Sequence, residues 1–155
     1  MMSTSIYIDA DACPVKDEVL KVAYRNNTPV FLVSNQWMRM EVGPLVEKVV
    51  VSQGADEADN WIAERVEHGD IAITADIPLA SRCLERNACV LGPTGKEFTN
   101  DNIGMALAVR EIKSEQRDMG EGKKGQMRGH LNAAFSKQDR SNFLQMLERL
   151  VQRLK

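Results

Sequence analysis

Short apolar runs alternate along the chain with stretches in which apolar residues recur every three or four positions. The runs are rich in Val and Ile, as in strands buried on both faces, and the periodic stretches are typical of helices with one apolar side. This alternation predicts an α/β fold: a doubly wound, mostly parallel five-stranded sheet with helices on both faces. The expected strands are 6–8, 29–33, 48–51, 71–74 and 87–91, and the expected helices lie near 15–23, 56–66, 79–86, 103–112 and 137–154.

Acidic residues stand where two of these strands end. Asp9 and Asp11 follow the first apolar run, and Asp76 follows the fourth. Parallel strands bring their carboxyl ends to one edge of the sheet, where α/β proteins bind ligands, so we expect these three side chains to lie together. The alternative is a structural role, in which each Asp accepts backbone N–H bonds in a turn or at the start of the next helix.

Two further acids open the helix after the third strand. Asp56 fits its N-cap and Asp59 its third position, where a carboxylate is favourable at the positive end of the helix dipole. One of them can also face the same edge as Asp9, and Asp59 is the favoured candidate. After the fifth strand, Asp101 or Asn100 is expected to cap the next helix, and Asp101 is a reserve ligand.

Carboxylates gathered at one edge repel each other, and a hard divalent cation is their natural partner. Mg2+ or Mn2+ with oxygen ligands is therefore the expected cofactor. Such a centre activates water and stabilises a leaving oxygen in phosphoryl hydrolysis. Three cysteines without C-x-x-C spacing and two histidines form no zinc motif. The candidate catalytic residues are Asp9, Asp11, Asp59 and Asp76, and the candidate metal ligands are Asp9, Asp11, Asp56, Asp59, Asp76 and Asp101.

The composition fits one globular domain: 155 residues, of which 43% are hydrophobic and 27% charged. The charge is uneven, because residues 1–109 carry 9 Lys and Arg against 16 Asp and Glu, whereas residues 110–155 carry 11 against 6. An acidic body with a basic tail suits a substrate that bears phosphates, such as nucleic acid. A solvated helix surface explains the tail equally well.

A stretch rich in Gly and Lys, residues 119–130, has the composition of a mobile loop. Its Lys123, Lys124 and Arg128 are expected to meet substrate phosphates if the loop closes over a ligand. A plain solvated linker is the alternative.

The segment 92–96, Gly-Pro-Thr-Gly-Lys, resembles a phosphate loop only superficially. Its glycines are too close together, and Glu97 stands where Ser or Thr is required, so a Walker site is rejected. Lys96 and the loop amides keep a weaker role as contacts for a substrate phosphate. Ser34 and Asn35, at the end of the second strand, are the other substrate-binding candidates.

The cysteines are odd in number and point to buried thiols in a reducing compartment. No secretory signal opens the chain, and no run approaches the roughly 20 apolar residues of a membrane helix. We therefore expect a cytoplasmic protein without a membrane partner.

Ser136 and Asp139 form a capping-box pattern before the helix 137–154, whose apolar stripe is expected to dock on the core or on the second subunit of a homodimer.

Four stretches closely resemble the bacterial YaiI/YqxD family: IYIDADACPVKDEVLKV (6–22), SQGADEADNWI (52–62), GDIAITADIPLA (69–80) and FSKQDR (135–140). The resemblance covers nearly the whole chain. The family is placed with PIN-like domains, many of which are metal-dependent ribonucleases, so the resemblance implies a PIN-like fold and Mg2+- or Mn2+-dependent cleavage of RNA.

On this resemblance, Asp9 matches the acid of the first strand and Asp76 the acid after the fourth. Asp56 or Asp59 matches the helix acid. PIN nucleases usually carry a fourth acid close after the third, and the sequence Ile-Pro-Leu-Ala at 77–80 supplies none. Asp11 or Asp101 then has to take its place.

Two other functions fit parts of the pattern. Asp9 and Asp11 also resemble the nucleophile and acid pair of haloacid-dehalogenase-like phosphatases, with Ser34 as the phosphate-binding hydroxyl. Against this, Cys13 stands where that family has Thr or Val, and a helix that starts at Pro14 leaves no room for the usual flap.

The third hypothesis is a non-catalytic nucleic-acid or nucleotide-binding module, in which the acids are caps or hold one structural cation. The hypotheses differ first in whether the acids converge.

Overall fold

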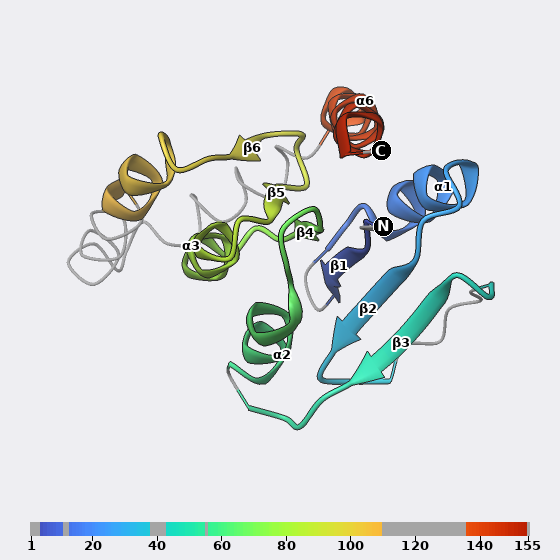
Figure 1. Cartoon of the computed structure of the whole chain (residues 1–155), viewed down its shortest axis with the longest axis horizontal. Helices are drawn as coiled ribbons and strands as arrows, with labels where there is room; N and C mark the ends of the chain where they lie inside the picture. Colours follow the sequence, from blue (N-terminus) through green and yellow to red (C-terminus); the bar gives the residue numbers. More distant parts are fainter. Residues whose placement is uncertain (1–3, 11–12, 38–42, 55, 110–135, 155) are drawn as a thin grey trace.

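The computed structural model describes residues 4–10, 13–37, 43–54, 56–109 and 136–154. Its centre is a six-stranded sheet in the order β3-β2-β1-β4-β5-β6, in which β1 to β5 are parallel and β6 is antiparallel to β5 (Figure 1). The doubly wound, mostly parallel fold is confirmed. The strands are β1 (Ile6–Asp9), β2 (Val30–Ser34), β3 (Val46–Val50), β4 (Ile71–Ile73), β5 (Cys89–Leu91) and β6 (Glu97–Phe98).

The strands differ from the prediction in number, by two residues at the starts of β3 and β5, and by one residue at other boundaries. A two-residue strand such as β6 is too short to show a pattern, and it pairs with β5 because the chain turns back at 92–96. β3 begins at Val46, two residues early, because this residue already pairs with Val30. β5 begins only at Cys89, since Asn87 has a left-handed backbone with φ of 66° that cannot continue a strand.

Helices cover both faces of the sheet. α1 (Lys16–Arg25) and α6 (Lys137–Leu154) pack on one face, and α2 (Glu57–Arg65) and α3 (Ile77–Glu85) pack on the other (Figure 1). Residues 103–109 are also helical. The alternation of β1 divides the core accordingly: Ile6 and Ile8 pack with α1 and α6, whereas Tyr7 packs with α2 and α3.

The C-terminal helix α6 docks on the core of its own chain. Its capping box is confirmed, because the Ser136 N–H donates to Asp139 Oδ2 at 2.9 Å and the Asp139 N–H donates to Ser136 Oγ at 3.2 Å. Most of its apolar stripe is buried against α1 and the sheet, and Leu154 is partly buried there, so the stripe itself does not require a second subunit. The buried residues of the stripe are Phe143, Leu147, Leu150 and Val151.

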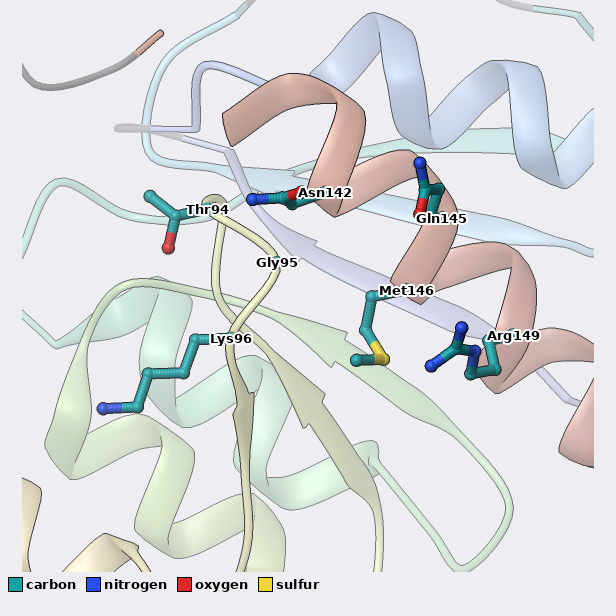
Figure 2. Close-up of a pocket in the computed structure, with 7 residues that line it drawn as sticks. All are labelled: Thr94, Gly95, Lys96, Asn142, Gln145, Met146 and Arg149. Carbon is teal, nitrogen blue, oxygen red and sulfur yellow. The ribbon is translucent and has the colours of Figure 1, made fainter. Parts of the chain in front are cut away.

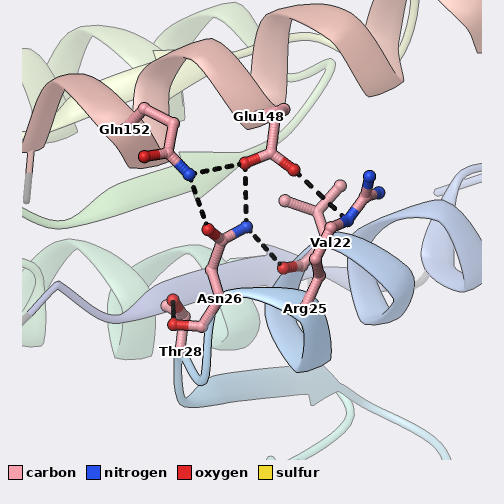
Figure 3. Close-up of polar contacts among 6 residues, drawn as sticks. All are labelled: Val22, Arg25, Asn26, Thr28, Glu148 and Gln152. Carbon is pink, nitrogen blue, oxygen red and sulfur yellow. Dashed lines mark hydrogen bonds and ion pairs between the residues drawn. The ribbon is translucent and has the colours of Figure 1, made fainter.

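A polar network joins α6 to the end of α1 (Figure 3). Glu148 Oε2 accepts from Asn26 Nδ2 at 2.9 Å and from Gln152 Nε2 at 2.9 Å, and Glu148 Oε1 lies 3.3 Å from Arg25 Nε. Asn26 Nδ2 also donates to the carbonyl of Val22 at 2.9 Å. These contacts fix α6 lengthwise along α1.

Among the described residues, no helix is long and apolar enough to cross a membrane.

The strand order places a topological switch point between β1 and β4. From β1 the chain proceeds to β2 and β3 on one side, and it returns to β4 and β5 on the other. In open α/β sheets the carboxyl ends of the strands on either side of such a point form the ligand-binding crevice.

Candidate functional site

Asp9 and Thr74 lie side by side at the switch point. β1 and β4 pair in register with Ile8 opposite Ile73, so the next residue on each strand projects at the same edge. The buried Thr74 hydroxyl donates to Asp9 Oδ2 at 3.0 Å and accepts from the Asp76 N–H at 2.9 Å. This hydroxyl therefore ties the acid of β1 to the backbone that carries the acid after β4.

Asp76 is the N-cap of α3. Its Oδ1 accepts from the Leu79 N–H at 2.9 Å, and Pro78 in the first turn has no N–H to satisfy. The structural role considered for this acid is thus real. It uses Oδ1, and Oδ2 stays available to a ligand as far as the described residues show.

Asp59 projects from α2 into the electrostatic field of the other two acids. Partial burial, and then the nearby carboxylates of Asp76 and Asp9, raise the pKa of Asp59 from 3.8 to about 6; Asp56 adds a smaller effect and Arg82 opposes it. Asp56 is exposed at the N-cap of α2, where its side chain makes no capping bond. The acid of α2 that is coupled to the edge is Asp59.

Strand alternation explains why these groups converge. Asp9 follows Tyr7 by two positions and Thr74 follows Ala72 by two, so both point to the sheet face that α2 and α3 cover. They open onto a cavity of about 150 Å3, here called the acidic cavity. It is lined by Asp9, Cys13, Thr74, Ala75, Asp76 and Pro93.

Comparison with known proteins places the whole chain in one family. The family model described as "Uncharacterized BCR, YaiI/YqxD family" matches residues 7–153. The chain belongs to the YaiI/YqxD family. It is similar to a "UPF0178 protein" of Parvibaculum lavamentivorans, with 54% identity over 98% of this chain and 96% of the relative. A "UPF0178 protein" of Agrobacterium fabrum is 52% identical over 97% of this chain and 94% of the relative. No solved structure matches the chain.

In this YaiI/YqxD member, four residues that line the acidic cavity were not predicted as site residues: Cys13, Thr74, Ala75 and Pro93. Thr74 was taken as the end of a strand, Cys13 only as a buried thiol, and Pro93 as part of a loop. Burial raises the pKa of the Cys13 thiol, so the thiol is the favoured form at neutral pH. Only Thr74 left a signal, since it is a polar residue that closes an apolar run beside the strand of Asp9.

Lys16 is a further residue that sequence reasoning missed. Its Nζ donates to the carbonyl of Cys13 at 2.8 Å and to the carbonyl of Ala10 at 3.3 Å. The lysine thus folds back from the first turn of α1 and supports the chain that leaves β1. It acts on the site by positioning the backbone next to Asp9.

Several predicted site residues lie away from the acidic cavity. Ser34 is buried at the end of β2, where its Oγ accepts from the Gln36 N–H at 3.1 Å, and it lines a separate small hollow with Lys48. Asn35 follows it and is partly exposed. Lys96 is exposed on the turn at 92–96 and lines a different cavity (Figure 2).

Asp101 is exposed, and the expected cap at Asp101 or Asn100 is wrong. Thr99 caps the helical residues 103–109 instead, because its Oγ1 accepts from the Asn102 N–H at 3.3 Å while Asn102 Oδ1 accepts from the Thr99 N–H at 2.9 Å. This reciprocal pair forms in the turn that leads into the helix, and Thr99 stands two residues before Asp101. Asp11, Lys123, Lys124, Arg128 and the predicted loop 119–130 lie outside the described residues.

The carboxylates of the acidic cavity suit a hard divalent cation, although they do not form a complete set of ligands around one. The described residues contain no group of three or more His, Cys, Asp or Glu placed to hold a metal ion. Mg2+ does not need one, because it keeps several of its waters and binds through one or two carboxylates. Asp9 and Asp76 on the cavity wall, with Asp59 within electrostatic reach, fit that requirement.

Proposed function

We propose that this protein is a metal-dependent phosphodiester hydrolase that acts on nucleic acid, with RNA as the substrate. The observation that carries the proposal is that Asp9 and Asp76 line one cavity at the switch point, with the Thr74 hydroxyl bonded to both segments. Burial, and then the carboxylates of Asp76 and Asp9, also raise the pKa of Asp59 nearby. Charge of this kind at a topological switch point is typical of a functional site. Nucleic acid as partner and the cytoplasm as location belong to the same proposal.

Each acidic side chain has a defined part in this proposal. Asp9 and Asp76 would hold Mg2+ or Mn2+ at the cavity, and Asp59 would complete the negative field that attracts the ion. The bound cation would supply an activated water and stabilise the leaving oxygen. Thr74 positions Asp9 through its 3.0 Å hydrogen bond and so limits the rotamers open to that carboxylate.

The phosphatase alternative has less support. It needs a hydroxyl after β2 to bind the phosphate beside Asp9, and Ser34 is not among the residues that line the acidic cavity. The non-catalytic module keeps its place as the alternative outcome of the experiment that follows.

The proposal is tested with labelled single-stranded RNA and Mn2+. Asp9→Asn and Asp76→Asn are expected to lower cleavage at least about 100-fold, because each substitution removes a charged ligand from the cation. Asp17→Asn is the matched control, since Asp17 is an exposed acid in the first turn of α1 and lies outside the acidic cavity. Circular dichroism checks that each variant is folded. Cleavage that persists in both variants contradicts the proposal, and RNA binding without cleavage in every form supports the module.

A further inference from the structure

A second and larger cavity lies between the turn at 92–96 and α6. Its volume is about 340 Å3, which falls in the range of roughly 300–1,000 Å3 typical of ligand pockets. Figure 2 shows the turn on one side and four side chains of α6 on the other: Asn142, Gln145, Met146 and Arg149. We call it the basic cavity.

The charge of the basic cavity is opposite to that of the acidic cavity. Two residues with cationic side chains, Lys96 and Arg149, line it, and no residue with a carboxylate does. The nearby acid Glu97 is already paired, because Arg153 Nη2 lies 2.9 Å from Glu97 Oε2. For Arg149 the described part of the chain shows no ion pair. The cavity therefore favours an anion, and the amides of Asn142 and Gln145 add hydrogen-bonding groups for neutral parts of the same ligand.

The two cavities lie on either side of one short turn. Pro93 lines the acidic cavity and the next residue, Thr94, lines the basic cavity. The turn is held by the Gly92 N–H, which donates to the Lys96 carbonyl at 2.8 Å, and by the Gly95 N–H, which donates to the Gly92 carbonyl at 3.0 Å. An extended ligand that crosses this turn meets both cavities in succession.

The turn is also pressed against α6. Gly95 has φ of +92°, and a Cβ added there would stand 2.8 Å from the backbone carbonyl carbon of Asn142. Only glycine allows this approach, so the spacing between the turn and the helix is set by backbone contact. The two cations differ in position: Lys96 Nζ lies 5.7 Å from the ring centre of Phe98, on the side of the turn away from α6, whereas Arg149 projects from α6 beside Met146 (Figure 2).

We propose that the basic cavity binds the backbone of a single-stranded nucleic acid whose neighbouring phosphodiester occupies the acidic cavity. This inference rests on the proposed function and names where its substrate continues. Arg149 binds a phosphate through its guanidinium fork, a geometry that suits phosphate oxygens. Asn142 and Gln145 face the attached ribose or base. Each cavity thus recognises a different part of the same strand.

The test measures RNA binding separately from cleavage. Full-length protein is titrated into labelled single-stranded RNA in EDTA, at several salt concentrations, and affinity is followed by fluorescence anisotropy. Arg149→Gln is expected to weaken binding about fivefold at low salt and to lower the slope of log K against log salt by about 0.7, the value for one phosphate on a single strand. Asn142→Asp places a carboxylate on the same wall and is expected to weaken binding as well. Lys21→Gln removes an equal charge from the exposed surface of α1 and is the matched control.

The outcomes separate the two proposals. Equal binding by Arg149→Gln, Asn142→Asp and Lys21→Gln, or no RNA binding by the unmodified protein, overturns the inference. A small diester, bis(p-nitrophenyl) phosphate, reports the acidic cavity alone when it is hydrolysed with Mn2+. Absence of cleavage of both substrates defeats the proposed function and leaves the binding comparison intact. Weaker RNA binding by Arg149→Gln and by Asn142→Asp, with Lys21→Gln binding as the unmodified protein does, is the result that the inference requires.

Discussion

The raised pKa of Asp59 makes the stability of the protein depend on pH in a defined direction. Between about pH 4 and pH 6 the folded protein keeps a proton on Asp59 that the unfolded chain has released. Stability due to this group therefore falls as the pH rises through that window, and the loss is complete above about pH 6. Asn is neutral at every pH, so the variant Asp59→Asn escapes this loss.

The size of the effect follows from the same shift. Raising a carboxyl pKa from 3.8 to about 6 corresponds to about 3 kcal/mol at full weight. Asp59 is only partly buried, and solvent screening reduces this figure to about 1.5 kcal/mol. The substitution also removes a favourable charge near the N-terminus of α2, which costs about 0.5 kcal/mol. Burial, together with repulsion from Asp76 and Asp9, outweighs the helix dipole, and Asp59→Asn is expected to gain about 1 kcal/mol at pH 7.

Urea unfolding, followed by tryptophan fluorescence at pH 4, 5, 6 and 7, measures this gain. We expect Asp59→Asn to match the unmodified protein within about 0.5 kcal/mol at pH 4 and to exceed it at pH 7. Asp56→Asn is the control, because Asp56 is an exposed acid in the same helix start. If Asp59→Asn shows no larger gain at pH 7 than at pH 4, or if Asp56→Asn gains as much, Asp59 is not buried near the other two acids in the way described.

Three further substitutions test the supports of the two cavities. Thr74→Val removes both hydrogen bonds that tie β1 to the segment after β4, and urea unfolding should show a loss of about 1–3 kcal/mol; a neutral effect would contradict the role given to this hydroxyl. Gly95→Ala should lower stability by about 1–2 kcal/mol because of its positive φ and its contact with α6, whereas Gly104→Ala, at a helical glycine with open space, should raise it by about 0.5–1 kcal/mol; thermal melts that rank the two the other way would refute the packing argument. Glu148→Ala breaks the network between α1 and α6 and should cost about 1–2 kcal/mol, against less than about 0.5 kcal/mol for the exposed Glu64→Ala, and equal unfolding midpoints for the two would show that the network adds nothing.

The fold was predictable from sequence because its signals are local. Each parallel strand is an apolar run, and the helices show their period within ten residues or so, which sufficed for the layers and for placing Asp9 and Asp76 at one edge. The choice between Asp56 and Asp59 was also local, since Asp59 precedes the buried Ile62 and Ala63 by three and four positions and thus shares their side of α2. One local prediction was wrong, the helix cap at Asp101. Thr99 and Asn102, which lie within one turn of it, bond to each other instead.

The remaining parts of the site depend on contacts between distant segments. Thr74 becomes a site residue only because β4 pairs with β1 in the observed register, and the sequence near Thr74 does not predict that register. The basic cavity forms only because α6 lies against the turn at 92–96. This contact is made by Gly95, which has a positive φ, and in the sequence Gly95 looks like an ordinary loop residue.

The pairing of two cavities of opposite sign discriminates between the possible ligands. A small phosphate ester carries its charge at one point, so it satisfies Arg149 or a cation at Asp9 and Asp76, but it does not reach both sides of the turn. A strand of nucleic acid repeats its charge at every nucleotide and can place one phosphate at a cation in the acidic cavity and another at the guanidinium. Pro93 lines one cavity and the next residue, Thr94, lines the other, so a ligand that occupies both cavities has to cross this turn, which favours a polymer. For this reason the charge pattern of the described residues supports a nuclease more strongly than it supports a phosphatase.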